Sequence, residues 1–105
     1  MYMKLKSGIL VFEWDKGNLD KSRRKHGITA EESESVFVDA NGFIVPDPRH
    51  SVHEERQVIF GRSNKQRTLH VVFTIRKKKI RVISARRMHK KEVEKYEKIK
   101  KDTNI

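Results

Sequence analysis

Apolar residues recur along this chain with two different periods, which together predict a fold of both strands and helices. Residues 68–76 alternate with a period of two, as a half-buried strand does. One face of this predicted strand carries Leu69, Val71, Phe73 and Ile75, and the other carries Thr68, His70, Val72 and Thr74. From 89 to 101 the period is helical instead, because Val93, Tyr96 and Ile99 return on one face.

Two further helices are predicted near the N-terminus. Residues 16–26 form the first, with Asp15 suited to its N-cap and Gly27 to its C-terminal stop. This helix has almost no apolar residue beyond Leu19, so it is expected on the surface. The second begins at the capping-box sequence Thr29-Ala30-Glu31-Glu32, and one of its sides carries Ala30, Ser33, Val36 and Phe37.

Turn signals divide the remaining chain into short strands. Asn41-Gly42 precedes a strand over 43–45 that ends at Pro46 and Pro48. The other predicted strands cover 57–60, ending at Gly61 before a hairpin loop over 62–67, and 79–85, after a turn at Lys77-Lys78 that contains no Gly or Asn. With a strand or edge segment at 12–14, the pattern predicts an α+β fold: two N-terminal helices, an antiparallel β-sheet with one face covered, and a C-terminal helix.

Length and composition limit this fold to one small domain over residues 1–105. Hydrophobic residues make up 35% of the chain and charged residues 37%, enough for one modest core inside a charged shell. The absence of cysteine excludes disulfides and thiolate metal sites and favours an intracellular protein. No apolar run has the length of a membrane span, and the first ten residues lack the features of a secretion signal. We therefore expect a cytoplasmic protein without a membrane partner.

Positive charge is concentrated at the C-terminal end. Residues 76–101 contain 13 lysines and arginines against three glutamates, a net charge of +10 out of the total of +11. A surface of this kind favours nucleic acid or an acidic protein as partner. The alternative is a solvated lysine-rich helix that serves solubility.

One cluster has the composition of a metal site. Asp47, His50, His53, Glu54 and Glu55 fall within nine residues. A helical zinc motif needs both histidines on one helical face, whereas Pro46 and Pro48 favour a loop here. We therefore expect a polar loop and no metal or other cofactor.

The residues left for chemistry are basic and titratable. The five glycines are scattered singly, and no serine has the setting of a nucleophile elbow, so phosphate loops and serine catalysis find no support. RNA can be cleaved without a metal by a base that deprotonates the 2′-hydroxyl, by arginines that stabilise the phosphorane, and by an acid. Candidates for these roles are Arg56, His70, Arg81, Arg86, Arg87, His89 and Tyr96. Composition and spacing alone leave an enzyme and a non-catalytic binding module equally open.

The order of several short motifs is more specific. The chain contains Phe12-Glu13-Trp14-Asp15, Asn18, Lys25-His26-Gly27-Ile28, Val36-Phe37 with Asp39, Asp47, Glu54-Glu55-Arg56, Gly61-Arg62, Arg81-Val82-Ile83-Ser84-Ala85-Arg86, Glu92 and Tyr96. In this order and spacing, from about residue 12 to 97, they resemble the BrnT toxin family.

The resemblance implies a RelE-like fold and an endoribonuclease that inhibits translation as the toxin of a type II toxin-antitoxin system. It also implies a DNA-binding BrnA-like antitoxin as partner, RNA as substrate, and contact with operator DNA through the antitoxin. A non-catalytic nucleic-acid-binding or partner-binding module on the same fold remains the alternative, and a ribosome-associated structural protein would explain the charge but not the motif order.

The resemblance also implies site residues. The catalytic candidates are His26, Glu55, Arg56, Arg81, Arg86 and Tyr96, with the three arginines expected on phosphate and His26 or Glu55 as the base. Structural alternatives exist for most of them, such as core packing for Tyr96, but a charge at the strand end after Ala85 has little packing purpose, so Arg86 stands out. The RNA-binding candidates are Arg76, Lys77, Lys78, Lys79, Arg87, His89 and Lys90.

Overall fold

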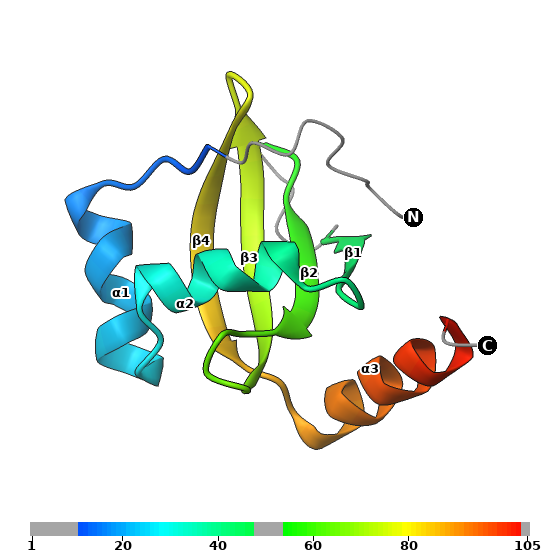
Figure 1. Ribbon diagram of the computed structural model, residues 1–105. Helices are drawn as coiled ribbons and strands as arrows, with labels where there is room; N and C mark the ends of the chain where they lie inside the picture. The colour runs from blue at the N-terminus through cyan, green and yellow to red at the C-terminus, as the bar shows by residue number, and fades with distance from the viewer. Residues whose placement is uncertain (1–10, 48–53, 104–105) are drawn as a thin grey trace.

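The computed structural model describes residues 11–47 and 54–103, which fold into helices around one β-sheet (Figure 1). The elements follow in the order α1 (Lys16–His26), α2 (Ala30–Ser35), a 3₁₀-helix η1 (Val36–Val38), β1 (Phe43–Pro46), β2 (Gln57–Arg62), β3 (Thr68–Arg76), β4 (Lys79–Arg87) and α3 (Lys90–Thr103). The predicted α+β fold with an antiparallel sheet is confirmed. Within the described ranges, no helix combines the length and the apolar character that a membrane crossing requires.

The sheet is a meander of four strands in which each strand pairs antiparallel with the next. The β3–β4 turn consists of Lys77 and Lys78, with φ angles of 49° and 66°. Two-residue hairpins favour such left-handed angles, normally supplied by Asn or Gly. The predicted turn therefore forms, although each lysine bears a strain on the order of 1 kcal/mol.

One face of the sheet holds the core. The strand register brings Ile59, Val71 and Ala85 side by side on this face. In Figure 1, α2 and η1 cross it, and they bury Val36 and Phe37 against the sheet. Burial of these side chains supplies the main apolar contribution to stability, at about 1.5–3 kcal/mol for each large side chain. The predicted covered face is present, and Val58, Val72 and Thr74 on the opposite face are buried as well.

A glycine lets η1 approach the sheet. β2 extends beyond the predicted strand, because Gly61 and Arg62 continue the ladder opposite β3. A Cβ atom at residue 61 would lie 2.7 Å from Cγ1 of Val36, closer than two carbon atoms can pack. Gly61 is therefore required for close packing, not for a turn as the sequence pattern suggested.

α1 lies beside β4 and helps to cover the outer edge of that strand (Figure 1). The helix has the predicted bounds and ends at Gly27, whose φ of 69° is typical of a C-terminal stop. Ser22 Oγ accepts a hydrogen bond of 2.8 Å from the amide of Ala85, and Phe12 forms a parallel bridge with Ile80 further along the same edge. These contacts protect an edge that could otherwise pair with another chain.

A buried carboxylate joins α2 to the loop between β2 and β3. Thr29 caps α2 by accepting a hydrogen bond from the amide of Glu32, as predicted. The fully buried Glu32 side chain accepts hydrogen bonds from Ser63 Oγ and from the guanidinium of Arg67. The Arg67 hydrogen bonds lower the pKa of Glu32 in spite of its burial. Because Arg67 also donates to the carbonyl of Gly27, this ion pair holds the end of α1, the start of α2 and the loop together.

β4 carries one residue more than β3 over their paired length. Val72 pairs with Ser84 and Phe73 with Val82, so Ile83 has no partner of its own. Such a β-bulge shifts the alternation of faces by one position. Strict alternation from Arg81 would place Arg86 on the core face, whereas the bulge returns Arg86 to the face of Arg81.

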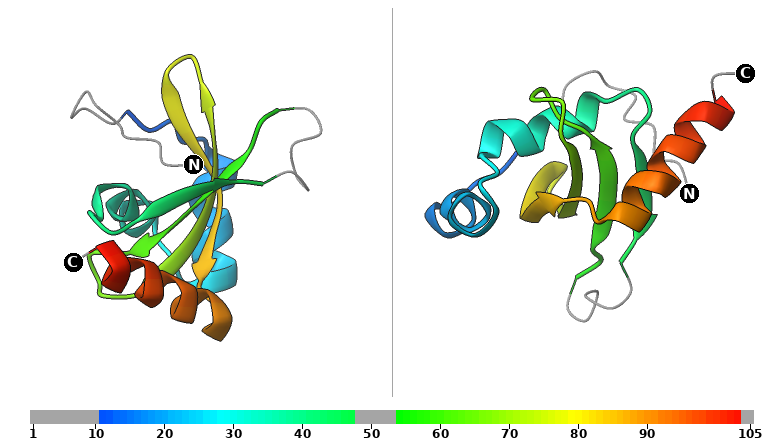
Figure 2. Two further views of the ribbon diagram at one scale, coloured as in Figure 1. Left: turned by 90° about the vertical axis from the view of Figure 1, so that its right-hand side faces the viewer. Right: turned by 90° about the horizontal axis from the view of Figure 1, so that it is seen from below.

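α3 lies across the end of the sheet opposite the β3–β4 turn (Figures 1 and 2). Tyr96 is buried and donates a 2.7 Å hydrogen bond to Asp39 Oδ2, which also accepts the amide of Arg62. A second contact joins Arg62 to Glu97 at 3.1 Å. The predicted C-terminal helix is confirmed, and Asp39 connects it to the segment after η1.

The Glu32–Arg67 pair should be the most costly ion pair to break. Arg67→Ala leaves a buried carboxylate without its cation, and we expect the free energy of unfolding to fall by about 3–5 kcal/mol. Urea denaturation at pH 7 measures this loss. As a control, Arg76→Ala removes the exposed partner of Glu54 and should cost less than about 1 kcal/mol. Equal losses in the two variants would show that burial does not set the contribution of Arg67.

Candidate functional site

The sheet face opposite the core gathers most of the predicted arginines. The β3–β4 register places Arg81 opposite Thr74 and Arg86 opposite His70, and residues on this face alternate with the core residues. The two pairs lie four positions apart along β3, which corresponds to about 13 Å along an extended strand. The face therefore presents two cationic positions that can hold different phosphates of one nucleic-acid strand.

A pocket of about 350 Å³ surrounds the first position, near the β3–β4 turn. The side chains of Arg56, Arg76 and Arg81 share this pocket although they come from three places in the sequence. The complete lining is Asp15, Gly17, Lys21, Glu54, Arg56, Arg76, Arg81, Val82 and Ile83. Four basic side chains thus face two acidic ones, which suits a phosphate group.

Carboxylates hold these arginines in place. Arg81 pairs with Asp15 and, at 3.5 Å, with Glu13. The hydrogen bond to Asp15 raises the pKa of Arg81 in spite of partial burial, so its guanidinium is permanently charged. Glu54 lies 3.0 Å from Arg76 and 3.6 Å from Arg56. The arginine heads are therefore oriented before any ligand binds, and a phosphate has to share or replace these carboxylates.

The second position is built around Arg86 and the start of α3. Both terminal nitrogens of Arg86 donate to Glu92, at 2.8 and 3.0 Å, and the amide of His89 donates to the same carboxylate at 2.7 Å. Burial opposes ionisation of Glu92, but the hydrogen bonds from Arg86 and His89 outweigh it and lower its pKa to about 2. The expectation that Arg86 has little structural purpose is wrong, because this pair joins β4 to α3.

His70 lies next to Arg86 and is held by aromatic packing. The ring of Phe60 meets the imidazole edge-on at 5.1 Å, and Phe43 stacks on Phe60 at 5.1 Å. Burial, followed by the charge of Arg86, lowers the pKa of His70. The sequence made His70 one of several candidates for cleavage chemistry, and only the register reveals that it neighbours Arg86.

The other catalytic candidates lie apart from these two positions. Tyr96 is buried between α3 and Asp39, where burial and this hydrogen bond raise its pKa to about 12. This placement agrees with the packing role considered from the sequence. His26 is exposed at the end of α1, and Glu55 is exposed just before β2, with its carbonyl oxygen accepting a hydrogen bond from Thr74. The lining of the arginine pocket includes none of the three side chains.

The predicted RNA-binding residues are all exposed. Arg76 lines the arginine pocket, and the three lysines at 77–79 form and follow the adjacent turn. Arg87 pairs with Leu69 and so projects from the core side of the sheet, unlike Arg86. His89 and Lys90 lie at the start of α3.

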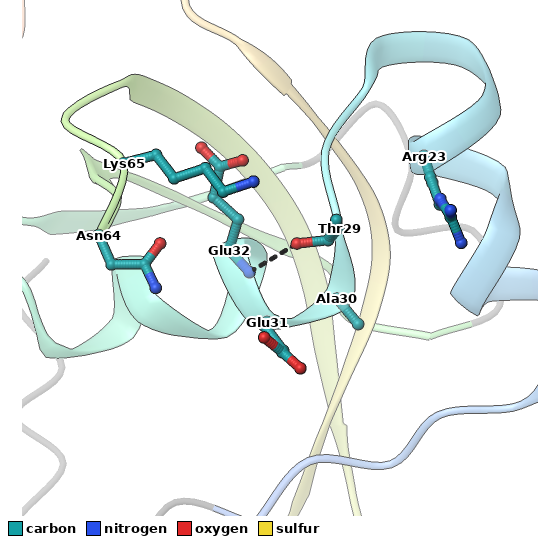
Figure 3. A pocket seen from close by; sticks show the side chains of 7 residues that line it. All are labelled: Arg23, Thr29, Ala30, Glu31, Glu32, Asn64 and Lys65. Carbon is teal, nitrogen blue, oxygen red and sulfur yellow. Dashed lines mark hydrogen bonds between the residues drawn. The ribbon is translucent and has the colours of Figure 1, made fainter.

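A second pocket, of about 520 Å³, lies between α1, α2 and the β2–β3 loop (Figure 3). Its lining mixes both charges: Arg23, Thr29, Ala30, Glu31, Glu32, Asn64 and Lys65. The Glu32 carboxylate already has partners in Arg67 and Ser63. None of the predicted site residues lines this pocket, so we assign the site to the arginine face.

The cluster that resembles a metal site is only partly covered by the structure. His50 and His53 lie outside the described residues. In residues 11–47 and 54–103, no three His, Asp or Glu side chains are grouped as ligands of a metal ion.

Comparison with known proteins identifies one family. A family model described as "Ribonuclease toxin, BrnT, of type II toxin-antitoxin system" matches residues 14–92, which is most of the chain. The match includes α1, all four strands and the first residues of α3. No curated protein matches the sequence.

The Arg86–Glu92 pair predicts a specific dependence of stability on pH. The pKa of Glu92 is lower in the folded chain than its ordinary value of 4.5. Its stabilising contribution is therefore complete above pH 4.5 and is lost as the pH falls towards 2, with an upper limit of about 3 kcal/mol. Glu92→Gln should reduce the free energy of unfolding at pH 7 and lose less on acidification than the unmodified chain.

Urea denaturation at pH 7 and pH 3 measures both effects. Glu94→Gln, at an exposed position of the same helix, is the matched control and should follow the unmodified chain. If Glu92→Gln and Glu94→Gln had the same pH dependence, the carboxylate of Glu92 would not stabilise the fold through Arg86.

Proposed function

Because the chain belongs to the BrnT family of ribonuclease toxins of type II toxin-antitoxin systems, we propose that it cleaves RNA internally with side chains alone, without a metal ion. The observation that carries this proposal is the common face of Arg81 and Arg86, which the bulge in β4 creates. The family supports the catalytic alternative over the non-catalytic binding module that the sequence left open. The cleavage of RNA by this toxin stops translation.

The proposed reaction uses the RNA's own 2′-hydroxyl as nucleophile. This oxygen attacks the adjacent phosphorus, and negative charge grows on the phosphorane oxygens. Arginines that are already oriented stabilise this charge better in the transition state than in the ground state, because water does not have to reorganise. Arg56 and Arg81 in the pocket, and Arg86 beyond them, are the proposed phosphate ligands. His26 and Glu55 remain candidates for the base, and Tyr96 is proposed to position α3.

The arginines must exchange carboxylate partners for phosphate. The Arg81 side chain is 20% exposed while paired with Asp15, whose side chain is 51% exposed. An exposed carboxylate of this kind returns to water at small cost, so the net loss on exchange is modest. The acidic residues thus keep the guanidiniums in position without blocking RNA.

An antitoxin neutralises toxins of this class. We propose a BrnA-like DNA-binding antitoxin, which would bring the complex to operator DNA. Its acidic groups would compete with RNA for the arginine face. The cytoplasm, where RNA and antitoxin are made, is the proposed location.

Replacement of Arg81 tests the arginine pocket. Arg81→Ala should lower the rate of RNA cleavage by about 10- to 100-fold, the effect of one charge-assisted contact of 1.5–3 kcal/mol. Arg81→Lys should recover only part of this, because an ammonium group cannot make two parallel hydrogen bonds. The assay is cleavage of an mRNA, both alone and in a cell-free translation reaction.

Lys98→Ala is the control for bulk charge, since Lys98 is exposed near the distal end of α3. It should leave the rate within about twofold of the unmodified chain, in line with a single screened surface charge. Equal losses in Arg81→Ala and Lys98→Ala would contradict a specific phosphate contact at Arg81.

Removal of divalent ions tests whether the cleavage needs a metal. RNA cleavage should persist in EDTA, because arginines supply the positive charge that a metal ion would supply in a metal-dependent nuclease. The same cleavage assay, with RNA alone and purified toxin, measures it. Loss of cleavage in EDTA that returns on addition of one divalent ion would overturn metal independence.

A further inference from the structure

We propose that His70 is the general base of RNA cleavage and that Arg86, directly opposite on β4, binds the scissile phosphate. This proposal rests on the proposed ribonuclease activity and names the residue that receives the proton. It replaces His26 and Glu55 in that role.

The position of His70 in the sheet is the first argument. His70 and Arg86 are register partners on neighbouring strands, so their side chains leave the same face side by side. The Arg81 pocket lies about 13 Å along the same face. A strand of RNA that places one phosphate at Arg81 can therefore place another at Arg86, with its ribose beside the imidazole.

The packing of the ring is the second argument. The edge-on contact with Phe60, at an interplanar angle of 82°, restricts rotation of the imidazole. Nδ1 is buried and makes no hydrogen bond to another residue in the described part of the chain. The residue as a whole is only partly buried, and Nε2 is the nitrogen that we assign to the 2′-hydroxyl. A ring fixed by packing in this way is already oriented for proton transfer.

The charges around His70 favour its neutral form. Burial is the largest effect that lowers the pKa of His70, and the charge of Arg86 on β4 lowers it further. The charges of Glu92 on α3 and Asp47 after β1 raise the pKa. The net effect keeps the pKa of His70 below its ordinary value, so the imidazole is an unprotonated base at neutral pH. Glu92 accepts a 2.8 Å hydrogen bond from Arg86 and neutralises part of its charge, which limits how far Arg86 lowers the pKa of His70.

The reaction balances with groups that are present. Nε2 of His70 takes the proton of the 2′-hydroxyl while the 2′-oxygen forms a bond to phosphorus. The bond between phosphorus and the 5′-oxygen breaks, and the departing oxygen takes a proton from water. The products are a 2′,3′-cyclic phosphate and a 5′-hydroxyl end, and the imidazolium then releases its proton to solvent.

The experiment compares His70→Gln with the unmodified toxin under single-turnover conditions from pH 5 to 9. The substrate is the RNA that the unmodified toxin cleaves best, and a copy with 2′-deoxyribose at the cleavage site measures binding without cleavage. Loss of a general base should lower the cleavage rate by about 100-fold or more. Binding of the deoxy copy should stay within about threefold, and Lys98→Ala is the control for both measurements.

The cleavage rate of the unmodified toxin should also rise with pH, with an apparent pKa below 6.5. This rise should be absent in His70→Gln. This measurement on the unmodified chain still tests the proposal if His70→Gln does not fold. A rate without this rise, or a His70→Gln rate within about fivefold of the unmodified rate, would overturn the role of His70. If His70 fails this test but Arg81→Ala still lowers the cleavage rate, the proposed function stands without His70. If Arg81→Ala and Arg86→Ala both cleave RNA at the normal rate, the assignment of the site to the arginine face is contradicted.

Discussion

The extra residue in β4 is the constraint on which both faces of the sheet depend. Ala85 packs in the core and Arg86 lies on the opposite face because Ile83 has no partner on β3. A regular strand would bring Arg86 to the core side, where an unpaired guanidinium would cost several kcal/mol. The same bulge therefore completes the hydrophobic core and aligns Arg81 with Arg86 on the other side. The core and the proposed site thus depend on the same irregular position, as is common for β-bulges near active sites.

Carboxylate–arginine pairs organise the molecule at three depths. Glu32 and Arg67 are innermost and hold helices to a loop, Glu92 and Arg86 are half-buried and attach α3, and Asp15 and Arg81 lie at the surface of the pocket. Their contributions to stability should decrease in that order, because solvent screens the outer pairs most. The exposure of the carboxylate increases in the same order, from 0% to 23% and 51%, whereas the three arginine side chains are similarly exposed, at 20–27%. This explains how a chain with a net charge of +11 can keep several arginines in fixed positions on one face.

Family membership establishes a ribonuclease toxin, and the fold indicates how the chemistry can be divided. In the proposed mechanism, arginines from β4 and from before β2 bind phosphate, while β3, the neighbouring central strand, contributes a histidine that packs against Phe60. A site on strands is more rigid than a site on loops, and rigid donors are the ones that stabilise a transition state. The proposed RNA-binding lysines at the β3–β4 turn would add a long-range attraction that steers RNA towards this face.

The sequence by itself determined the elements and the family. The period of two in β3, the stop at Gly27 and the cap at Thr29 are local signals that depend on nearest neighbours, and the structure has each of them. The motif order also identified a family of ribonuclease toxins, which the family match confirms. The arrangement of the site was decided by tertiary structure. A bulge at Ile83 has no signature in a run such as Arg81–Arg87, and the partners of Glu32, Arg86 and His70 lie 35, 6 and 16 positions away in the chain. Such contacts depend on strand register and on helix docking, which form only when the whole core packs, so local periodicity cannot encode them.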